Sequence, residues 1–158
     1  MVVEYTSWDN RRRDVMSRET MFEIIENADT CVFTHLRKDG APVSAVVGGT
    51  AVDGEVYTLT SVLRLAYTRI QHDPRCSVIF DIAPIGSVTI MGRAEVVDDP
   101  VIMDKFFEAL SPTRKMVRAG HISADDFTRL ANTPNRRLFH VIPERWFATD
   151  LRTLDMEK

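Results

Sequence analysis

The chain has 158 residues, enough for one domain, residues 1–158, that buries its own core. Hydrophobic residues make up 44% and charged residues 27%, which is the balance of a globular protein. The net charge of −3 disfavours a nucleic-acid partner, and no apolar run approaches the roughly 18 residues that a membrane span needs. The N-terminal segment has no apolar stretch after its charges, so no secretory signal is expected. We therefore predict a cytoplasmic protein without a membrane partner.

The cysteine and histidine pattern argues against a disulfide scaffold and against a metal site. Cys31 and Cys76 lie inside strand-like runs, where reduced thiols act as small hydrophobic residues. A zinc site needs paired Cys or His at short spacing, but the histidines are scattered at positions His35, His72, His121 and His140. His35 is interpreted as a histidine at the edge of the core. We predict free thiols and no bound metal.

The first half of the chain reads as an arm, a helix and three strands. Residues 1–16 are polar and predict an N-terminal arm, and Ser17 can cap a helix with an apolar face. Residues 30–37 alternate between apolar and polar, and turn signals at Asp39-Gly40 and Asp53-Gly54 bound strands at 42–52 and 55–60. These three strands predict an antiparallel meander.

The second half adds three strands and two helices. Strands are expected at 75–83, 86–97 and 136–142, the last ended by a proline, with helices around 100–110 and 123–132. Gly48, Gly49 and Gly92 fall inside strands and indicate bulges or sharp coiling, as a small closed barrel requires. The expected fold is mainly β (α+β), a six-stranded antiparallel barrel with peripheral helices.

The stretch TLTSVLRLAYTRIQHDP, residues 58–74, has two interpretations. In the first, Ser61 caps a helix whose free amides, with the hydroxyls of Thr58 and Thr60 and the guanidinium of Arg64, form a phosphate site. In the second, the segment is only a capped helix joining two strands, and its arginines keep it soluble. Helical spacing would place Leu63, Tyr67 and Ile70 against the barrel, and Arg69 on the far side.

Several segments of this sequence resemble the pyridoxamine 5'-phosphate oxidase-like split-barrel flavoproteins. They are FTHLRKDGAPVSAVV at 33–47, VYTLT at 56–60, HDPRCSVIF at 72–80, VTIMGRAEVVDDP at 88–100 and RLFHVIPERWFATD at 137–150. Their order and spacing are more specific than any one of them. The resemblance implies a six-stranded split barrel that works as a homodimer, with a flavin in a groove between the subunits.

The same resemblance implies the cofactor-binding residues. The strand end Thr58, Leu59, Thr60 and Ser61 matches the segment along the flavin and its phosphate, and Arg64 matches a phosphate-binding arginine. The strand at 43–47 matches the segment beside the isoalloxazine ring, which implicates Val43, Ser44, Ala45 and Val46. Trp146 matches the region that reaches the partner's flavin. Many members carry a lysine where this chain has Ala66, a departure expected to weaken phosphate binding.

These observations predict a flavin-dependent oxidoreductase that transfers hydride between FMN and a small substrate that the sequence does not identify. The protein would supply position and electrostatics, and no catalytic residue is assigned. One alternative is a reductase that uses the deazaflavin coenzyme, which also carries a phosphate. The others are a protein that holds a flavin or haem-like ligand without turnover, and a structural dimer with an empty groove.

Overall fold

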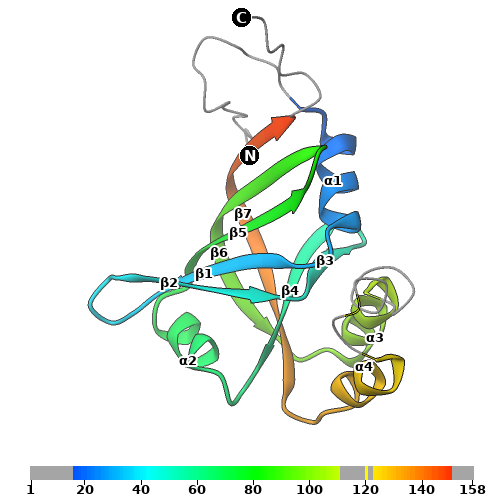
Figure 1. Ribbon diagram of the computed structural model, residues 1–158. Coiled ribbons are helices and arrows are strands. Elements are labelled where there is room, and N and C mark those ends of the chain that lie inside the picture. The colour runs from blue at the N-terminus through cyan, green and yellow to red at the C-terminus, as the bar shows by residue number, and fades with distance from the viewer. Residues whose placement is uncertain (1–15, 111–119, 121–122, 151–158) are drawn as a thin grey trace, which may run out of the picture.

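The computed structural model describes residues 16–110, 120 and 123–150, which form a curled antiparallel sheet with helices around it (Figure 1). The predicted arm at 1–16 lies outside these residues except for Met16, which is buried. The strands are β1 (Cys31–Leu36), β2 (Pro42–Val47), β3 (Gly49–Val52), β4 (Glu55–Ser61), β5 (Arg75–Ile82), β6 (Gly86–Val97) and β7 (Arg136–Asp150). The helices are α1 (Arg18–Asn27), α2 (Leu65–His72), α3 (Pro100–Ala109) and α4 (Ala124–Ala131).

The two edges of the curled sheet are connected through Gly48. Its strand order is β2-β1-β5-β6-β7-β4-β3, so the two edge strands are β2 and β3, which are separated in the sequence only by this glycine. The Gly48 carbonyl accepts a hydrogen bond from the Leu59 amide at 2.8 Å, which joins this corner to β4. The prediction of a mainly β split barrel is confirmed. The strand count differs because the expected strand at 42–52 is broken at Gly48 into β2 and β3.

The last strand is longer than predicted, because Pro143 does not end it. β7 continues to Asp150 alongside β6, with a register shift in which Met91 pairs with Arg145 and Gly92 with Pro143. Proline lacks the amide that a regular ladder needs, and a bulge tolerates it. A side chain at position 92 would overlap the carbonyl oxygen of Ile142, so only glycine fits the close approach of the two strands here.

Local capping residues fix the ends of the helices. The Ser17 hydroxyl accepts from the Thr20 amide at 3.1 Å, as predicted, and Asp99 caps α3 by accepting from the Val101 amide at 2.8 Å. Ser123 accepts from the amide of Asp126 at 3.1 Å, which confirms the predicted start of α4. Within the described ranges, no helix is long and apolar enough to cross a membrane.

Two apolar clusters stabilise the fold. The larger lies between α1 and the barrel and includes Ile24, Ile25, Phe80 and Ile90, all fully buried. The smaller joins α3 and α4 to β4 and β7. Both cysteines are buried, and neither forms a disulfide, as predicted. Helix α2 packs against β1, β6 and β4, away from α3 and α4 (Figure 1).

Candidate functional site

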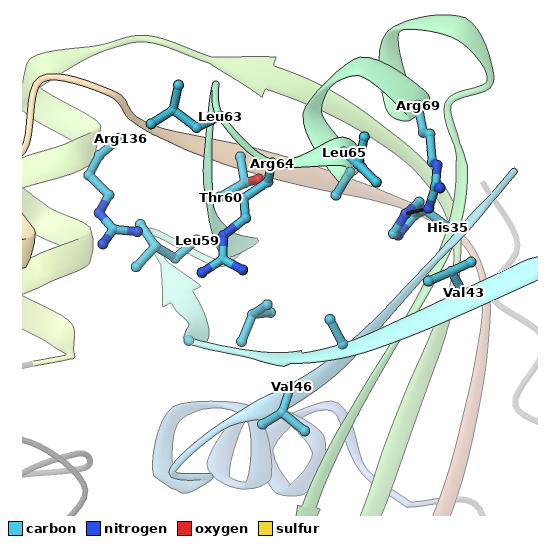
Figure 2. A pocket seen from close by; sticks show the side chains of 14 residues that line it. His35, Val43, Val46, Leu59, Thr60, Leu63, Arg64, Leu65, Arg69 and Arg136 are labelled. Atoms are coloured by element: carbon cyan, nitrogen blue, oxygen red, sulfur yellow. Dashed lines mark hydrogen bonds between the residues drawn. The ribbon is translucent and has the colours of Figure 1, made fainter.

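A pocket of about 590 Å³ lies where α2, the end of β4 and strand β2 meet (Figure 2). Its volume is within the roughly 300–1,000 Å³ typical of small-molecule sites. The residues that line it come from five elements and the turns between them: His35, Val43, Ala45, Val46, Val47, Gly48, Leu59, Thr60, Leu63, Arg64, Leu65, Ala66, Arg69 and Arg136. The pocket therefore depends on the connection at Gly48, which brings strand β2 near the end of β4.

The turn after β4 differs from the predicted helix cap. Helix α2 begins at Leu65, with Arg64 as its N-cap residue and no side-chain cap. The Ser61 hydroxyl accepts instead from the Leu63 amide at 3.3 Å, and the Ser61 carbonyl accepts from the Arg64 amide at 2.9 Å. The Val62 amide donates to the Asn135 carbonyl at 3.0 Å. The prediction that Ser61 caps a helix with three free amides was wrong, because all three amides are bonded within the turn or to the segment before β7.

Three arginines give the pocket its charge. Arg64, Arg69 and Arg136 line it, and none of the lining residues within the described ranges is acidic. Arg136 is the register partner of Ser61, which places it beside the end of β4. Burial lowers the pKa of Arg136, and the charge of Arg64 lowers that pKa further. Two guanidiniums this close favour an anion between them, because the anion offsets their mutual repulsion.

Arg69 is not on the far side of α2, as was expected, but lines the pocket. Its Nη1 lies 3.2 Å from Nε2 of His35, on β1. His35 is 4% exposed, and its pKa is lowered by burial and then by the charge of Arg69. A guanidinium only donates, so Nε2 of His35 accepts and the neutral ring carries its proton on Nδ1.

Most of the other residues that line the pocket are apolar, and three of them are strongly exposed to solvent. Val46, Leu63 and Leu65 are 69%, 77% and 69% exposed, although all three line the pocket. Leu63 was expected to pack against the barrel, but it precedes the helix and points outward at the rim. Ala66, in contrast, is half-buried and packs against the larger core cluster.

The structure brings most of the predicted site residues together. Those that line the pocket are Val43, Ala45, Val46, Leu59, Thr60 and Arg64. Ser44 is on the other face of β2, where its hydroxyl lies 2.8 Å from that of Thr34. Thr58 is fully buried, and Ser61 forms the turn described above. Trp146 is buried and borders a different pocket of about 380 Å³, against Phe22 of α1.

Sequence reasoning missed Arg136 and undervalued Arg69 and His35. The pairing of β4 with β7 places Arg136 and Arg137 beside the strand end at 58–61. It joins segments about 75 residues apart in the sequence, and hydrophobic periodicity gives no signal for so distant a contact. Arg137 itself pairs with Asp98 at 3.1 Å. Among the described residues, no group of three or more His, Cys, Asp or Glu side chains could hold a metal ion.

Solved structures share this fold at low sequence identity. A conserved hypothetical protein from Mycobacterium tuberculosis matches with a TM-score of 0.73 and 20% identity over 93% of each chain. General Stress Protein 26 from Bacillus anthracis matches with a TM-score of 0.64 and 21% identity, over 82% of this chain and 91% of that one. An F420 reductase matches with a TM-score of 0.56 and 18% identity, over 78% of this chain and 93% of that one.

The family relationship comes from the sequence. No curated protein matches this chain. The sequence model of the pyridoxamine 5'-phosphate oxidase family matches residues 17–150, which is most of the chain and includes the whole pocket. The chain therefore belongs to the pyridoxamine 5'-phosphate oxidase family.

Proposed function

We propose that this protein is a cytoplasmic, homodimeric oxidoreductase that binds FMN in the arginine-lined pocket and transfers hydride to or from a small substrate. The observation that supports it is the set of three arginines, Arg64, Arg69 and Arg136, in the wall of the pocket. A dianionic phosphate is the group that such a donor set fits, since guanidinium–phosphate pairs combine charge with directed hydrogen bonds.

The pocket's two kinds of wall suit a phosphorylated flavin. Arg64 and Arg136, at the end of β4, would hold the phosphate, with Thr60 beside them. The apolar side chains of Val43, Ala45 and Leu65 would lie against the flat ring and keep water from it. A bound flavin supplies the hydride chemistry, and the chain supplies position and charge.

Strand β2 and the rim of the pocket support the homodimer. Val46, Leu63 and Leu65 leave an exposed apolar rim, and exposed apolar patches commonly mark interfaces. We propose that a second copy of the chain covers this rim and completes the flavin site. Sedimentation should give a dimer at micromolar concentration, and Val46→Lys should shift it toward monomer. A stable 18 kDa species of the unmodified protein would contradict the dimer.

The second candidate is a reductase that uses the deazaflavin coenzyme. Its support is the structural similarity to an F420 reductase, since F420 is a deazaflavin with a phosphate and would use the same arginines. The two coenzymes differ at the ring, where the wall formed by Val43–Val47 offers few polar side chains to distinguish them.

Titrations with paired ligands test the proposal. The protein is titrated with FMN, riboflavin and F420, following flavin fluorescence, and the spectrum of protein purified from its host is recorded. We expect FMN to bind about ten- to a hundred-fold tighter than riboflavin, and Arg64→Ala to lose that preference, because a charge-assisted hydrogen bond contributes about 1.5–3 kcal/mol. Arg93→Ala, on an exposed part of β6, is the matched control.

The outcomes separate the candidates. F420 binding without FMN binding would favour the deazaflavin reductase. Bound coenzyme that no electron donor reduces would favour a carrier without turnover, and a Soret band in the purified protein would favour a haem-like ligand. If FMN and riboflavin bind equally, or if FMN, riboflavin and F420 all fail to bind, the phosphate site is wrong and residues 58–74 only join two strands.

A further inference from the structure

The cations of the pocket are divided between two places. Figure 2 shows Arg136 on one side of the pocket and Arg69 with His35 on the opposite side, next to Val43, while Arg64 lies between them. The charge of Arg64 contributes to lowering the pKa of Arg136, whereas the charge of Arg69 contributes to lowering the pKa of His35. The phosphate proposed above needs only the pair at the end of β4. Arg69 is therefore not needed for the phosphate and is available to bind a second group.

Arg69 is held in place by an uncharged partner. His35 is buried and accepts one hydrogen bond from Nη1, which fixes the guanidinium against β1 without neutralising it. In the part of the chain that the structure describes, no carboxylate lies within 4.0 Å of Arg69. An ion pair with a carboxylate would have neutralised the charge of Arg69. A neutral histidine leaves that charge, and the remaining N–H groups, available to a ligand in the pocket.

We infer that Arg69, positioned by His35, binds a carboxylate on the substrate. The inference rests on the proposed function, in which the other two arginines hold the cofactor's phosphate. One planar guanidinium carries a single charge and presents two parallel donors, which match the charge and the fork of a carboxylate. A substrate anchored there would have its carboxylate beside Val43 and its body along the apolar wall that faces the flavin. The substrate class is thus a small organic acid.

His35 acts here through Arg69 and is a positioning residue. Glutamine can place its Oε1 where Nε2 of His35 lies, and so can accept the same hydrogen bond, whereas methionine fills the space and offers only a weak acceptor. His35→Gln should therefore keep most of the selectivity for a carboxylate, and His35→Met should lose it. A merely structural role of His35 would make the two variants differ only in stability.

The test compares benzoate with benzamide, which has nearly the same shape and no charge. Both are titrated by NMR into the full-length protein without flavin, so the result does not depend on the cofactor. We expect benzoate to bind at least about tenfold tighter than benzamide, and Arg69→Gln to abolish this ratio. Arg69→Lys should keep part of it, and Arg93→Gln should keep all of it. The circular dichroism spectrum and melting temperature of each variant confirm that it is folded.

The same titration is repeated with FMN bound. Benzoate that still binds, and that perturbs the flavin spectrum in the wild type but not in Arg69→Gln, supports a substrate site beside the cofactor. Equal affinities for benzoate and benzamide would overturn the inference. So would a ratio that depends on Arg136 instead of Arg69, or complete displacement of benzoate by FMN, which would mean that Arg69 faces the cofactor. Failure of FMN to bind while benzoate selectivity persists overturns the proposed cofactor alone.

Discussion

Ser61 and Arg136 are direct partners in the register of β4 and β7, and this pairing brings the arginine to the end of the pocket where we propose that the phosphate binds. Arg64 follows Ser61 by one turn and lies close enough to lower the pKa of Arg136. In the protein without a bound anion, the positive charges of Arg64 and Arg136 repel one another, which costs electrostatic free energy. A dianion bound between them would remove that cost, so its affinity depends on both residues jointly.

The first prediction follows from this pair. Arg136→Gln should weaken FMN binding about ten- to a hundred-fold and leave riboflavin binding nearly unchanged, because only FMN carries the phosphate. In a double-mutant cycle with Arg64→Gln, the two losses should not add, since both residues bind one group. Fluorescence titration of the four proteins measures this. An equal loss for FMN and riboflavin would show that Arg136 shapes the pocket rather than binding phosphate.

The second prediction concerns Ala66, where many relatives are expected to carry a lysine. Ala66 lines the pocket and packs partly against the core, so the stem of a lysine could run along the wall with its ammonium in the pocket. Ala66→Lys should tighten FMN binding about tenfold, the value of one added charge-assisted bond, at a small loss of stability. Ala66→Met, of similar length and without charge, is the control. If the methionine variant binds FMN as tightly, packing and not charge explains the change.

The third prediction tests the bulge between β6 and β7. Gly92→Ala should lower the free energy of unfolding by about 1–3 kcal/mol or more, because the added methyl overlaps the backbone carbonyl of Ile142, which cannot turn aside. Gly48→Ala should cost less, since its nearest neighbour is a methyl group of Leu110 at 3.3 Å, the far end of a flexible side chain. Urea denaturation of both variants compares them. Equal losses of stability in the two variants would mean that the backbone at the bulge shifts to accommodate the added methyl group.

The parts of the fold that could be predicted from the sequence depend on local interactions. Ser17 and Asp99 cap helices through amides two or three residues away, and the alternating pattern of β1 reflects burial on one face. The parts that could not be predicted depend on distant contacts. Ser61 is not a cap, because the Val62 amide is bonded to Asn135 across the fold. Pro143 does not end β7, because Gly92 allows a bulge opposite it.

In the candidate site, too, the residues in contiguous segments were predicted and those that depend on distant contacts were not. The predicted residues at 43–46 and 58–64 mostly line one pocket, since the resemblance concerned those contiguous segments. Arg69 was misplaced because Leu63 was counted as part of the packing face of α2, although the helix begins after it. His35 gave no signal beyond strand alternation. Its role depends on Arg69, which is 34 residues away in the sequence.

The last prediction concerns the pH dependence of stability. Burial and the charge of Arg69 hold the pKa of His35 below its ordinary value of 6.5 in the folded protein. The unfolded chain therefore takes up a proton near pH 6.5, while the folded protein takes it up only at lower pH. Between the two values the unfolded state binds more protons, so stability falls as the pH drops below 6.5, by at most about 1.4 kcal/mol per pH unit.

Variants isolate this contribution from that of the other titrating groups. His35→Gln keeps an acceptor for Arg69 and cannot be protonated, so it should reduce the loss of stability between pH 7.5 and 5.5. His72→Gln, on the exposed end of α2, is the matched histidine control. Urea denaturation at three pH values in this range measures the slopes. Because the folded protein binds this proton less readily than the unfolded chain, the difference between wild type and His35→Gln must grow as the pH falls below 6.5. A constant difference would mean that His35 takes up its proton equally in the folded and unfolded states, and that neither burial nor Arg69 lowers its pKa.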